Sequence, residues 1–90
     1  MTWQKTGPDE WQLKSTNFAI ILTKYTQSEF YAHLESTSDE INYVRRMFIT
    51  ANDLAMAQDF ALSLLRRDLA AMKDVINQDL TTLTGDENDA

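Results

Sequence analysis

The chain of 90 residues contains no cysteine, one proline, two glycines and a single histidine, His33. Without cysteine it can form neither a disulfide framework nor a thiolate metal site, and intracellular residence is the natural expectation. A lone imidazole makes no catalytic dyad, and on an alternating strand we expect His33 to point to solvent or to lie at a sheet edge. These absences exclude several common catalytic and metal-binding designs.

Long apolar runs are also missing. The longest, FAIIL at residues 18–22, is far shorter than the roughly 20 residues that a membrane span requires. The first residues, MTWQK, lack the apolar core of a signal peptide. The sequence therefore predicts a soluble, cytoplasmic protein that does not associate with membranes.

One feature dominates what is present, a predicted amphipathic helix over residues 50–80. Thr50 stands three residues before Asp53, a spacing typical of a helix N-cap, and no proline or glycine follows until Gly85, where the helix should have ended. The apolar positions recur at helical spacing on one face. They are Leu54, Ala57, Ala61, Leu64, Leu65, Leu69, Met72, Val75, Ile76 and Leu80. A strict heptad seam would include Asp68 and Gln78, so the stripe favours packing on a sheet over a long coiled coil.

The first half of the chain supplies the sheet. Residues 11–14, 18–25 and 30–34 alternate or are rich in β-branched and aromatic residues, and turn-forming residues separate them. A meander is the simplest topology, and Trp3 adds a short edge strand. One sheet face is predicted to meet the helix through Trp11, Leu13, Phe18, Ile20, Leu22, Phe30, Ala32 and Leu34.

Residues 38–49 allow two interpretations. Ile41, Tyr43, Met47 and Ile49 alternate as in a strand, whereas a capping box at Thr37 and apolar residues at helical spacing indicate a helix. A helix start directly after Ile49 favours the strand. We therefore predict an α+β fold, an antiparallel meander of three or four strands packed on one long C-terminal helix. Residues 1–80 form the domain, and residues 81–90 form an acidic, disordered tail.

Catalysis has little support. The adjacent carboxylates at residues 9–10 and 39–40 fall in predicted turns, where solvation or capping is their usual role. Asp86, Glu87 and Asp89 lack the ligand spacing and central glycine of a calcium loop. We predict no enzyme and no catalytic, cofactor-binding or metal-binding residue.

The charge distribution favours a protein partner. Of the net charge of −6, residues 1–49 carry −1, from five basic and six acidic residues, and residues 50–90 carry −5, from three and eight. This charge opposes direct nucleic-acid binding, since the basic pairs at residues 45–46 and 66–67 have no wider basic stripe. Acidic surfaces commonly only maintain solubility, but they also suit a basic partner surface. The residues predicted to bind a partner are Asp59, Asp74, Trp3, Trp11 and Tyr31.

Length gives a second candidate surface. A 30-residue helix is about 45 Å long and an eight-residue strand about 27 Å, so the helix should extend beyond the sheet. Either the N-terminal segment or a second subunit must then cover its last apolar residues. The predicted self-association residues, which would form a homodimer, are Leu69, Met72, Val75, Ile76 and Leu80.

The overall layout is a leading tryptophan, β-rich segments and then an alanine-rich helix entered through Phe48 and Thr50. This layout resembles many small proteins of bacteria and their phages, and the resemblance implies no activity. The sequence favours a small acidic, non-enzymatic regulatory or inhibitory protein that acts by protein contact. The alternative is a homo-oligomeric structural or accessory protein that assembles through the C-terminal half of the helix.

Overall fold

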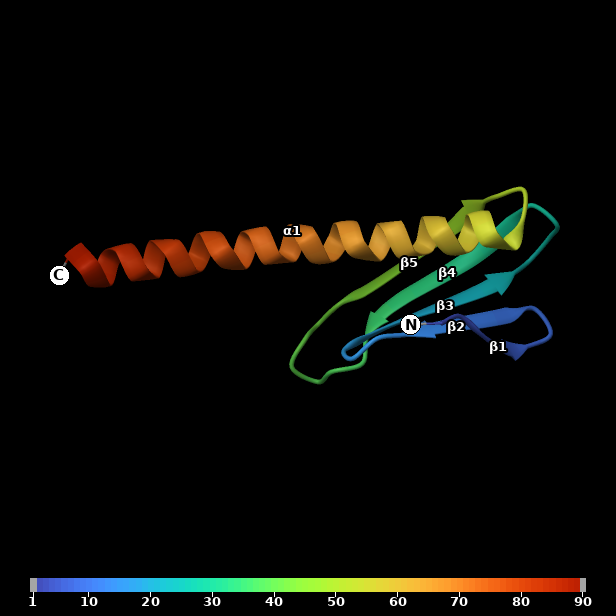
Figure 1. Ribbon diagram of the computed structural model, residues 1–90, viewed down its shortest axis with the longest axis horizontal. Coiled ribbons are helices and arrows are strands. Elements are labelled where there is room, and N and C mark those ends of the chain that lie inside the picture. The colour runs from blue at the N-terminus through green and yellow to red at the C-terminus, as the bar shows by residue number, and fades with distance from the viewer. Residues whose placement is uncertain (1, 90) are drawn as a thin grey trace.

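The computed structural model describes the backbone of residues 2–89 and the side chains of residues 2–82. Its elements in chain order are β1 Gln4–Gly7, β2 Glu10–Lys14, β3 Phe18–Lys24, β4 Glu29–Ser36, β5 Val44–Thr50 and α1 Leu54–Asp89. Each strand pairs antiparallel with the next, and α1 lies across one face of the sheet (Figure 1). The predicted α+β fold, a meander packed on one C-terminal helix, is confirmed.

The described part of the chain holds five strands, slightly more than the three or four predicted. The additional one is β1, which begins directly after Trp3, where a short edge strand was expected, although its sequence QKTG has no apolar alternation. It exists because the chain turns back after Gly7 and pairs with β2, with an irregularity between Lys5 and Gly7. Pairing rather than side-chain pattern therefore produces this edge strand.

The strand interpretation of residues 38–49 is correct for Val44–Thr50, and the helical alternative is wrong. Residues 37–43 form a loop instead of a helical turn. At the start of this loop the hydroxyl of Ser36, the last residue of β4, donates to the Ser38 carbonyl at 3.0 Å and accepts from the Ser38 amide at 3.1 Å. Such local side-chain bonds compete with the helical ladder.

Helix α1 begins later than predicted, and Thr50 is not its cap. Thr50 still pairs with Glu29 in the sheet, and the Ala51 amide donates to the Ser28 carbonyl at 3.0 Å. The chain leaves the sheet only after Ala51, so Asp53 becomes the N-cap and its Oδ1 accepts from the Met56 amide at 2.8 Å.

The far end of α1 also differs from the prediction. The helix continues through Gly85 to Asp89, so the predicted stop at or before Gly85 is wrong. Ala90 lies outside the described residues. The division into a domain of residues 1–80 and an acidic tail of residues 81–90 stays a prediction.

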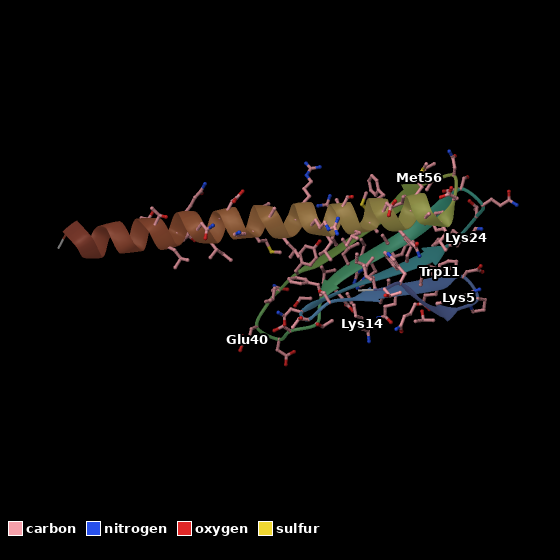
Figure 2. The ribbon with its side chains drawn as sticks, in the orientation of Figure 1. Lys5, Trp11, Lys14, Lys24, Glu40 and Met56 are labelled. Carbon is pink, nitrogen blue, oxygen red and sulfur yellow. The ribbon has the colours of Figure 1, made fainter. Side chains whose placement is uncertain are left out.

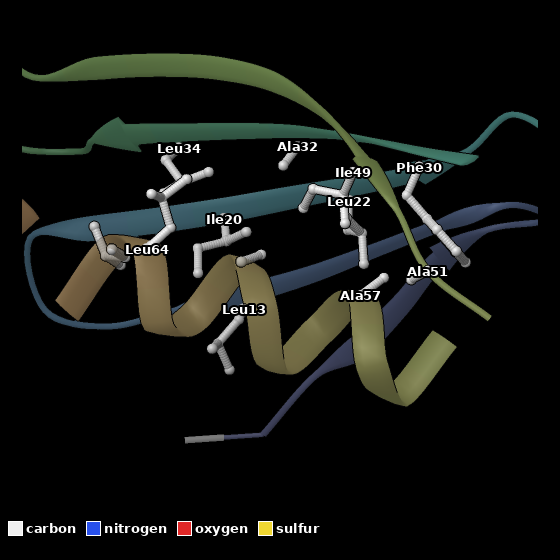
Figure 3. Packing of buried hydrophobic residues seen from close by; sticks show 12 residues of the cluster. Leu13, Ile20, Leu22, Phe30, Ala32, Leu34, Ile49, Ala51, Ala57 and Leu64 are labelled. Carbon is white, nitrogen blue, oxygen red and sulfur yellow. The ribbon is translucent and has the colours of Figure 1, made fainter. Parts of the chain in front are cut away.

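The core lies between the sheet and the first half of α1 (Figure 3). Ala57 and Ala61 are fully buried, and their small side chains let the helix backbone approach the strands closely. Of the eight residues predicted to face the helix, Trp11 and Phe18 are only half-buried. The buried members of this core are Leu13, Ile20, Leu22, Phe30, Ala32, Leu34, Ile49, Ala51, Ala57, Ala61, Leu64 and Leu65.

The second half of α1 projects beyond the sheet (Figure 1). The helix has 36 residues and is therefore about 54 Å long, which accounts for most of the 60 Å extent of the molecule. Leu69 is the last of its residues that packs against the core. The predicted overhang is thus present. Among the described residues, no helix combines the length and the apolar character that crossing a membrane requires.

Candidate interaction surfaces

The face of the sheet opposite α1 is uncovered in the described structure; we call it the open face. Side chains alternate along each strand, so residues between the buried ones lie on this face. The strand register aligns them in rows across β2 to β5. One row consists of Glu10, Thr23, Tyr31 and Phe48.

Three aromatic side chains gather at one end of the open face and form what we call the aromatic cluster, Tyr25, Tyr31 and Phe48. Ring centroids are 5.0 Å apart between Tyr31 and Phe48, 5.6 Å between Tyr25 and Phe48, and 6.3 Å between Tyr25 and Tyr31. Tyr25 and Phe48 are 64% and 63% exposed, so most of their surface is available for contact. Exposed aromatic groups held in fixed mutual geometry are typical anchors of protein interfaces.

Carboxylates accompany the aromatic cluster on the same face. Glu10 lies in the row of Tyr31, and Glu29 pairs with Thr50 at the adjacent end of β4 and β5. Glu35 lies two positions beyond His33 on β4. Three carboxylates share this face with two basic residues, Lys14 and Arg46, so the open face combines apolar anchors with a small excess of negative charge, which suits a partner that offers apolar and basic side chains.

His33 lies on the open face, on β4 between β3 and β5, so of the two expected positions it has the solvent-facing one and not one at a sheet edge. Arg46 Nε donates to His33 Nδ1 at 3.1 Å, and His33 Nε2 lies 3.0 Å from Glu35 Oε2. Because an arginine N–H only donates, Nδ1 accepts and Nε2 carries the proton that is shared with Glu35. The Nδ1 contact joins β4 to β5, whereas the Nε2 contact lies within β4.

On the helix side, one polar cluster joins β5 to α1. The Tyr43 hydroxyl donates to Asp68 Oδ2 at 2.6 Å, and Arg45 Nη1 lies 3.0 Å from Asp68 Oδ1. Burial raises the pKa of the Tyr43 phenol well above its ordinary range, and the hydrogen bond to the Asp68 carboxylate adds to the rise. As expected for a strand, Arg45 and Arg46 thus contact partners on opposite faces.

Replacing Tyr43 with phenylalanine tests this cluster. We expect the free energy of unfolding to fall by about 1–2 kcal/mol, because a half-buried hydrogen bond to a charged group is lost. Since the folded-state pKa is raised, the contribution of Tyr43 is fully present below the ordinary tyrosine pKa of about 10 and is lost as pH rises above it. Urea unfolding at several alkaline pH values should show a smaller alkaline loss of stability in Tyr43→Phe than in the wild type. An identical pH profile in both proteins would contradict this assignment.

The structure does not bring the predicted partner-binding residues together. Asp59 and Asp74 are exposed on α1, and Tyr31 is on the open face. Trp3 packs against the core, whereas the ring of Trp11 lies 5.8 Å from the Lys5 ammonium group, near the β1 edge (Figure 2). Their joint role in partner binding stays a prediction.

The sequence interpretation missed Tyr25 and Phe48, the two most exposed members of the aromatic cluster. Tyr25 follows β3 directly, and Phe48 is opposite Tyr31 in the β4–β5 register. The alternation of β5 places Phe48 on the face opposite Met47 and Ile49. The alternation can be read from the sequence, but the proximity of Phe48 to Tyr31 follows only from the β4–β5 register.

The projecting half of α1 carries the second surface. Val75, Ile76 and Leu80 are each more than half exposed, and Met72 is half-buried. Ala71, Met72, Val75 and Ile76 line an open, almost entirely apolar hollow of about 400 Å³. The predicted self-association residues therefore share one continuous part of the helix, except that Leu69 also contacts the core.

Comparisons with protein-family models, with curated proteins and with solved structures find no match to this chain. The functional argument consequently rests on the two surfaces themselves.

Proposed function

We propose that the chain is a small acidic, non-enzymatic protein that regulates or inhibits another protein by binding it through the open face. The observation that carries this proposal is the aromatic cluster, in which Tyr25 and Phe48 are nearly two-thirds exposed on a sheet face that α1 does not cover. Folding alone gains little from aromatic side chains in such positions.

The chemistry of the face defines the partner. Aromatic anchors bind apolar side chains, and the carboxylates of Glu10, Glu29 and Glu35 favour lysine or arginine around them. The net charge of −6 attracts the same kind of surface at longer range. The partner we propose is therefore a protein surface with apolar residues ringed by basic ones. The absence of direct nucleic-acid binding and the cytoplasmic location stay predictions.

Affinity capture from host lysate with mass-spectrometric identification tests the proposal. Tyr25→Thr combined with Phe48→Thr keeps residues that suit strands but removes the anchors. We expect the dissociation constant of the captured partner to rise by about 30-fold or more, as for the loss of one binding hot spot of about 2 kcal/mol. Phe60→Ala is the matched control, because it removes an aromatic side chain that is 48% exposed on α1, and it should leave capture unchanged.

A second arm separates the open face from the acidic side of the helix. The Asp59→Lys, Asp74→Lys double variant reverses the two exposed carboxylates originally predicted to bind a partner. Capture at two salt concentrations should weaken with salt if charge contributes to binding. If partner capture were lost in this variant but fully retained in the Tyr25→Thr, Phe48→Thr variant, the contact would lie on α1, and the proposal that the open face binds the partner would be wrong.

The alternative function, a homo-oligomeric structural or accessory protein, is favoured by one specific observation. Val75, Ile76 and Leu80 are 56–58% exposed on the projecting half of α1. An apolar stripe of this kind usually meets another chain. Assembly through α1 and binding through the open face use different surfaces, so one protein can do both.

A further inference from the structure

We infer that the outer edge of β5 binds an extended segment of the partner protein, which joins the sheet as a further strand antiparallel to β5. This inference rests on the proposed function, because it specifies how the open face holds its partner and what sequence pattern the partner offers. It concerns backbone groups of β5, whereas the proposed function rests on aromatic side chains.

Two hydrogen bonds at the ends of β5 show which of its backbone groups point to β4. Before the strand, the Ser36 amide donates to the Tyr43 carbonyl at 2.9 Å. After the strand, the Ala51 amide donates to the Ser28 carbonyl at 3.0 Å. Such bonds recur at every second residue of an antiparallel pair, so the odd-numbered residues of β5 bond to β4. The residues whose N–H and C=O groups point to the outer edge are therefore Val44, Arg46, Phe48 and Thr50.

This outer edge is uncovered in the described structure. β5 is the last strand of the sheet, on the side away from β1 (Figure 1). Within the described part of the chain, no hydrogen bond reaches the four outward N–H and C=O pairs. The side chains of Val44 and Phe48 are more than half exposed, so neither α1 nor a loop lies over this edge. An uncovered row of backbone donors and acceptors is a template for an additional strand.

The other edge of the sheet, β1, is less suited to this role. It has four residues, and its register with β2 shifts between Lys5 and Gly7. By contrast, β5 pairs with β4 at each of its seven residues without a shift and contains neither proline nor glycine. Short or irregular edges resist strand addition. β5 is therefore the edge that offers a continuous ladder.

A strand added to β5 would also reach the aromatic cluster. Side-chain direction and backbone direction alternate with the same period in a strand, so the four outward residues have their side chains on the open face. The added strand would lie about 4.8 Å from β5. Its residue opposite Phe48 would extend the row that contains Tyr31 and Phe48. An apolar side chain at that position would therefore contact the aromatic cluster from its outer side.

The helix side of the same edge also has room for side chains. An open hollow of about 360 Å³ lies between the beginning of β5 and α1. The residues that line it are Tyr43, Val44, Arg45, Asp68, Ala71 and Met72. The residue of the added strand opposite Arg45 would point to this side of the sheet. A small apolar side chain such as valine would enter the hollow there.

Charges at the two ends of the edge define the outer positions of the segment. Val44 lies opposite Glu35, and Thr50 lies opposite Glu29. Each carboxylate is thus on the strand two places from the added one, about 10 Å away in its row. A lysine or arginine side chain and the glutamate side chain span this distance together. The segment should therefore have a basic residue at each end.

Arg46 defines the position between them. Its Nε donates to His33, and its terminal nitrogens suit an acidic residue on the added strand. From the residue opposite Thr50 to the residue opposite Val44, the expected pattern is basic, any, apolar, any, acidic, small apolar, basic. This pattern is consistent with a partner surface that has apolar residues ringed by basic ones.

The same charges disfavour a second copy of β5 as the occupant. β5 contains Arg45 and Arg46 and no carboxylate, so pairing two copies would set four arginines in adjacent strands. In the register centred on Met47, no basic residue would fall in the rows of Glu29 and Glu35. Like charges on an edge strand are a common protection against self-pairing. A segment with the complementary pattern has no such conflict.

Hydrogen exchange followed by NMR tests the strand addition. In the free protein the four outward amides should exchange about tenfold faster or more than those of Arg45, Met47 and Ile49, which bond to β4. The probe is the end-blocked peptide Lys-Thr-Ile-Thr-Glu-Val-Lys, which at saturation should slow the outward amides by about tenfold or more. No binding, or binding without this slowing, would overturn the inference. Outward amides that are slow in the free protein and become fast on dilution would indicate a second copy on this edge and would also overturn it.

A matched peptide tests the pattern and the orientation. Lys-Thr-Glu-Thr-Ile-Val-Lys exchanges the apolar and acidic positions but keeps the composition and the net charge. It should bind about tenfold more weakly, because it places glutamate beside Phe48 and isoleucine beside Arg46. Equal affinities would mean that net charge alone attracts the peptide, and tighter binding of the matched peptide would indicate a parallel segment. Either result would overturn the inference.

Backbone methylation tests the same edge with the captured partner. A chemically synthesised chain methylated at the Phe48 nitrogen keeps the phenyl ring but loses one outward donor. We expect its stability in urea to be unchanged and the dissociation constant of the partner to rise by about tenfold or more. The matched control is methylation at the Met47 nitrogen, which bonds to β4, so this change should destabilise the fold instead.

This experiment separates the inference from the proposed function. If the chain methylated at Phe48 bound the partner normally while the Tyr25→Thr, Phe48→Thr variant did not, the open face would bind the partner without strand addition. The inference would then be wrong and the proposed function would stand. If neither change weakened binding, both would be wrong.

Discussion

Replacing Phe30 with alanine should lower the free energy of unfolding by about 3–5 kcal/mol, the usual cost of removing a buried phenyl ring. Phe30 is fully buried on β4, opposite Ile49 of β5, and points toward the beginning of α1 (Figure 3). Loss of the ring would leave a cavity between β4, β5 and the beginning of α1. A domain of this size has a total stability of roughly 5–13 kcal/mol, so the variant should be near its unfolding midpoint at moderate temperature or in little denaturant.

Urea unfolding followed by circular dichroism measures this loss. Phe48→Ala is the matched control, because it makes the same change on the neighbouring strand at a side chain that is 63% exposed. It should cost under about 1.5 kcal/mol, from aromatic contacts within the cluster alone. Equal losses in the two variants would mean that the core does not lie on the side of the sheet that α1 covers.

The strands in which apolar residues strongly alternate with polar ones were predictable from the sequence. Residues 11–14, 18–25 and 30–34 correspond closely to β2, β3 and β4, since each puts apolar residues on one face at period two. The strand β1 has no such pattern and depends on pairing with β2. An element formed by pairing alone leaves little trace in its own residues.

The ends of the helix show how tertiary structure overrides local signals. Thr50 and Asp53 are both good caps, and the sheet decides between them by keeping Thr50 and Ala51 in its hydrogen bonding. At the other end, Gly85 lowers helix propensity but does not end α1. Local preferences of about 1 kcal/mol, such as these, are easily reversed by their surroundings.

Contacts between residues far apart in the sequence account for the other features that could not be predicted. Along α1 no basic residue stands three or four positions from Asp68, and its carboxylate instead binds Tyr43 from the loop before β5 and Arg45 from β5. The aromatic cluster depends likewise on the β4–β5 register, because a shift of one residue would place the β5 side chains on the other face of the sheet. The apolar stripe around Ile76, by contrast, was predictable because it lies within one helix.

Replacing Ala61 with leucine should also destabilise the fold, by about 1–3 kcal/mol, although it adds apolar surface. Ala61 belongs to α1 and is fully buried against the sheet, and neighbouring Ala57 also points at the strands (Figure 3). Three extra carbon atoms have no room there, so α1 must move away from β3 and β4 or adopt strained rotamers. Ala70→Leu, on the exposed side of the same helix, should stay within about 0.5 kcal/mol of the wild type in urea unfolding. If Ala61→Leu were as stable as this control, α1 would not pack on the sheet as closely as the small side chains of Ala57 and Ala61 allow.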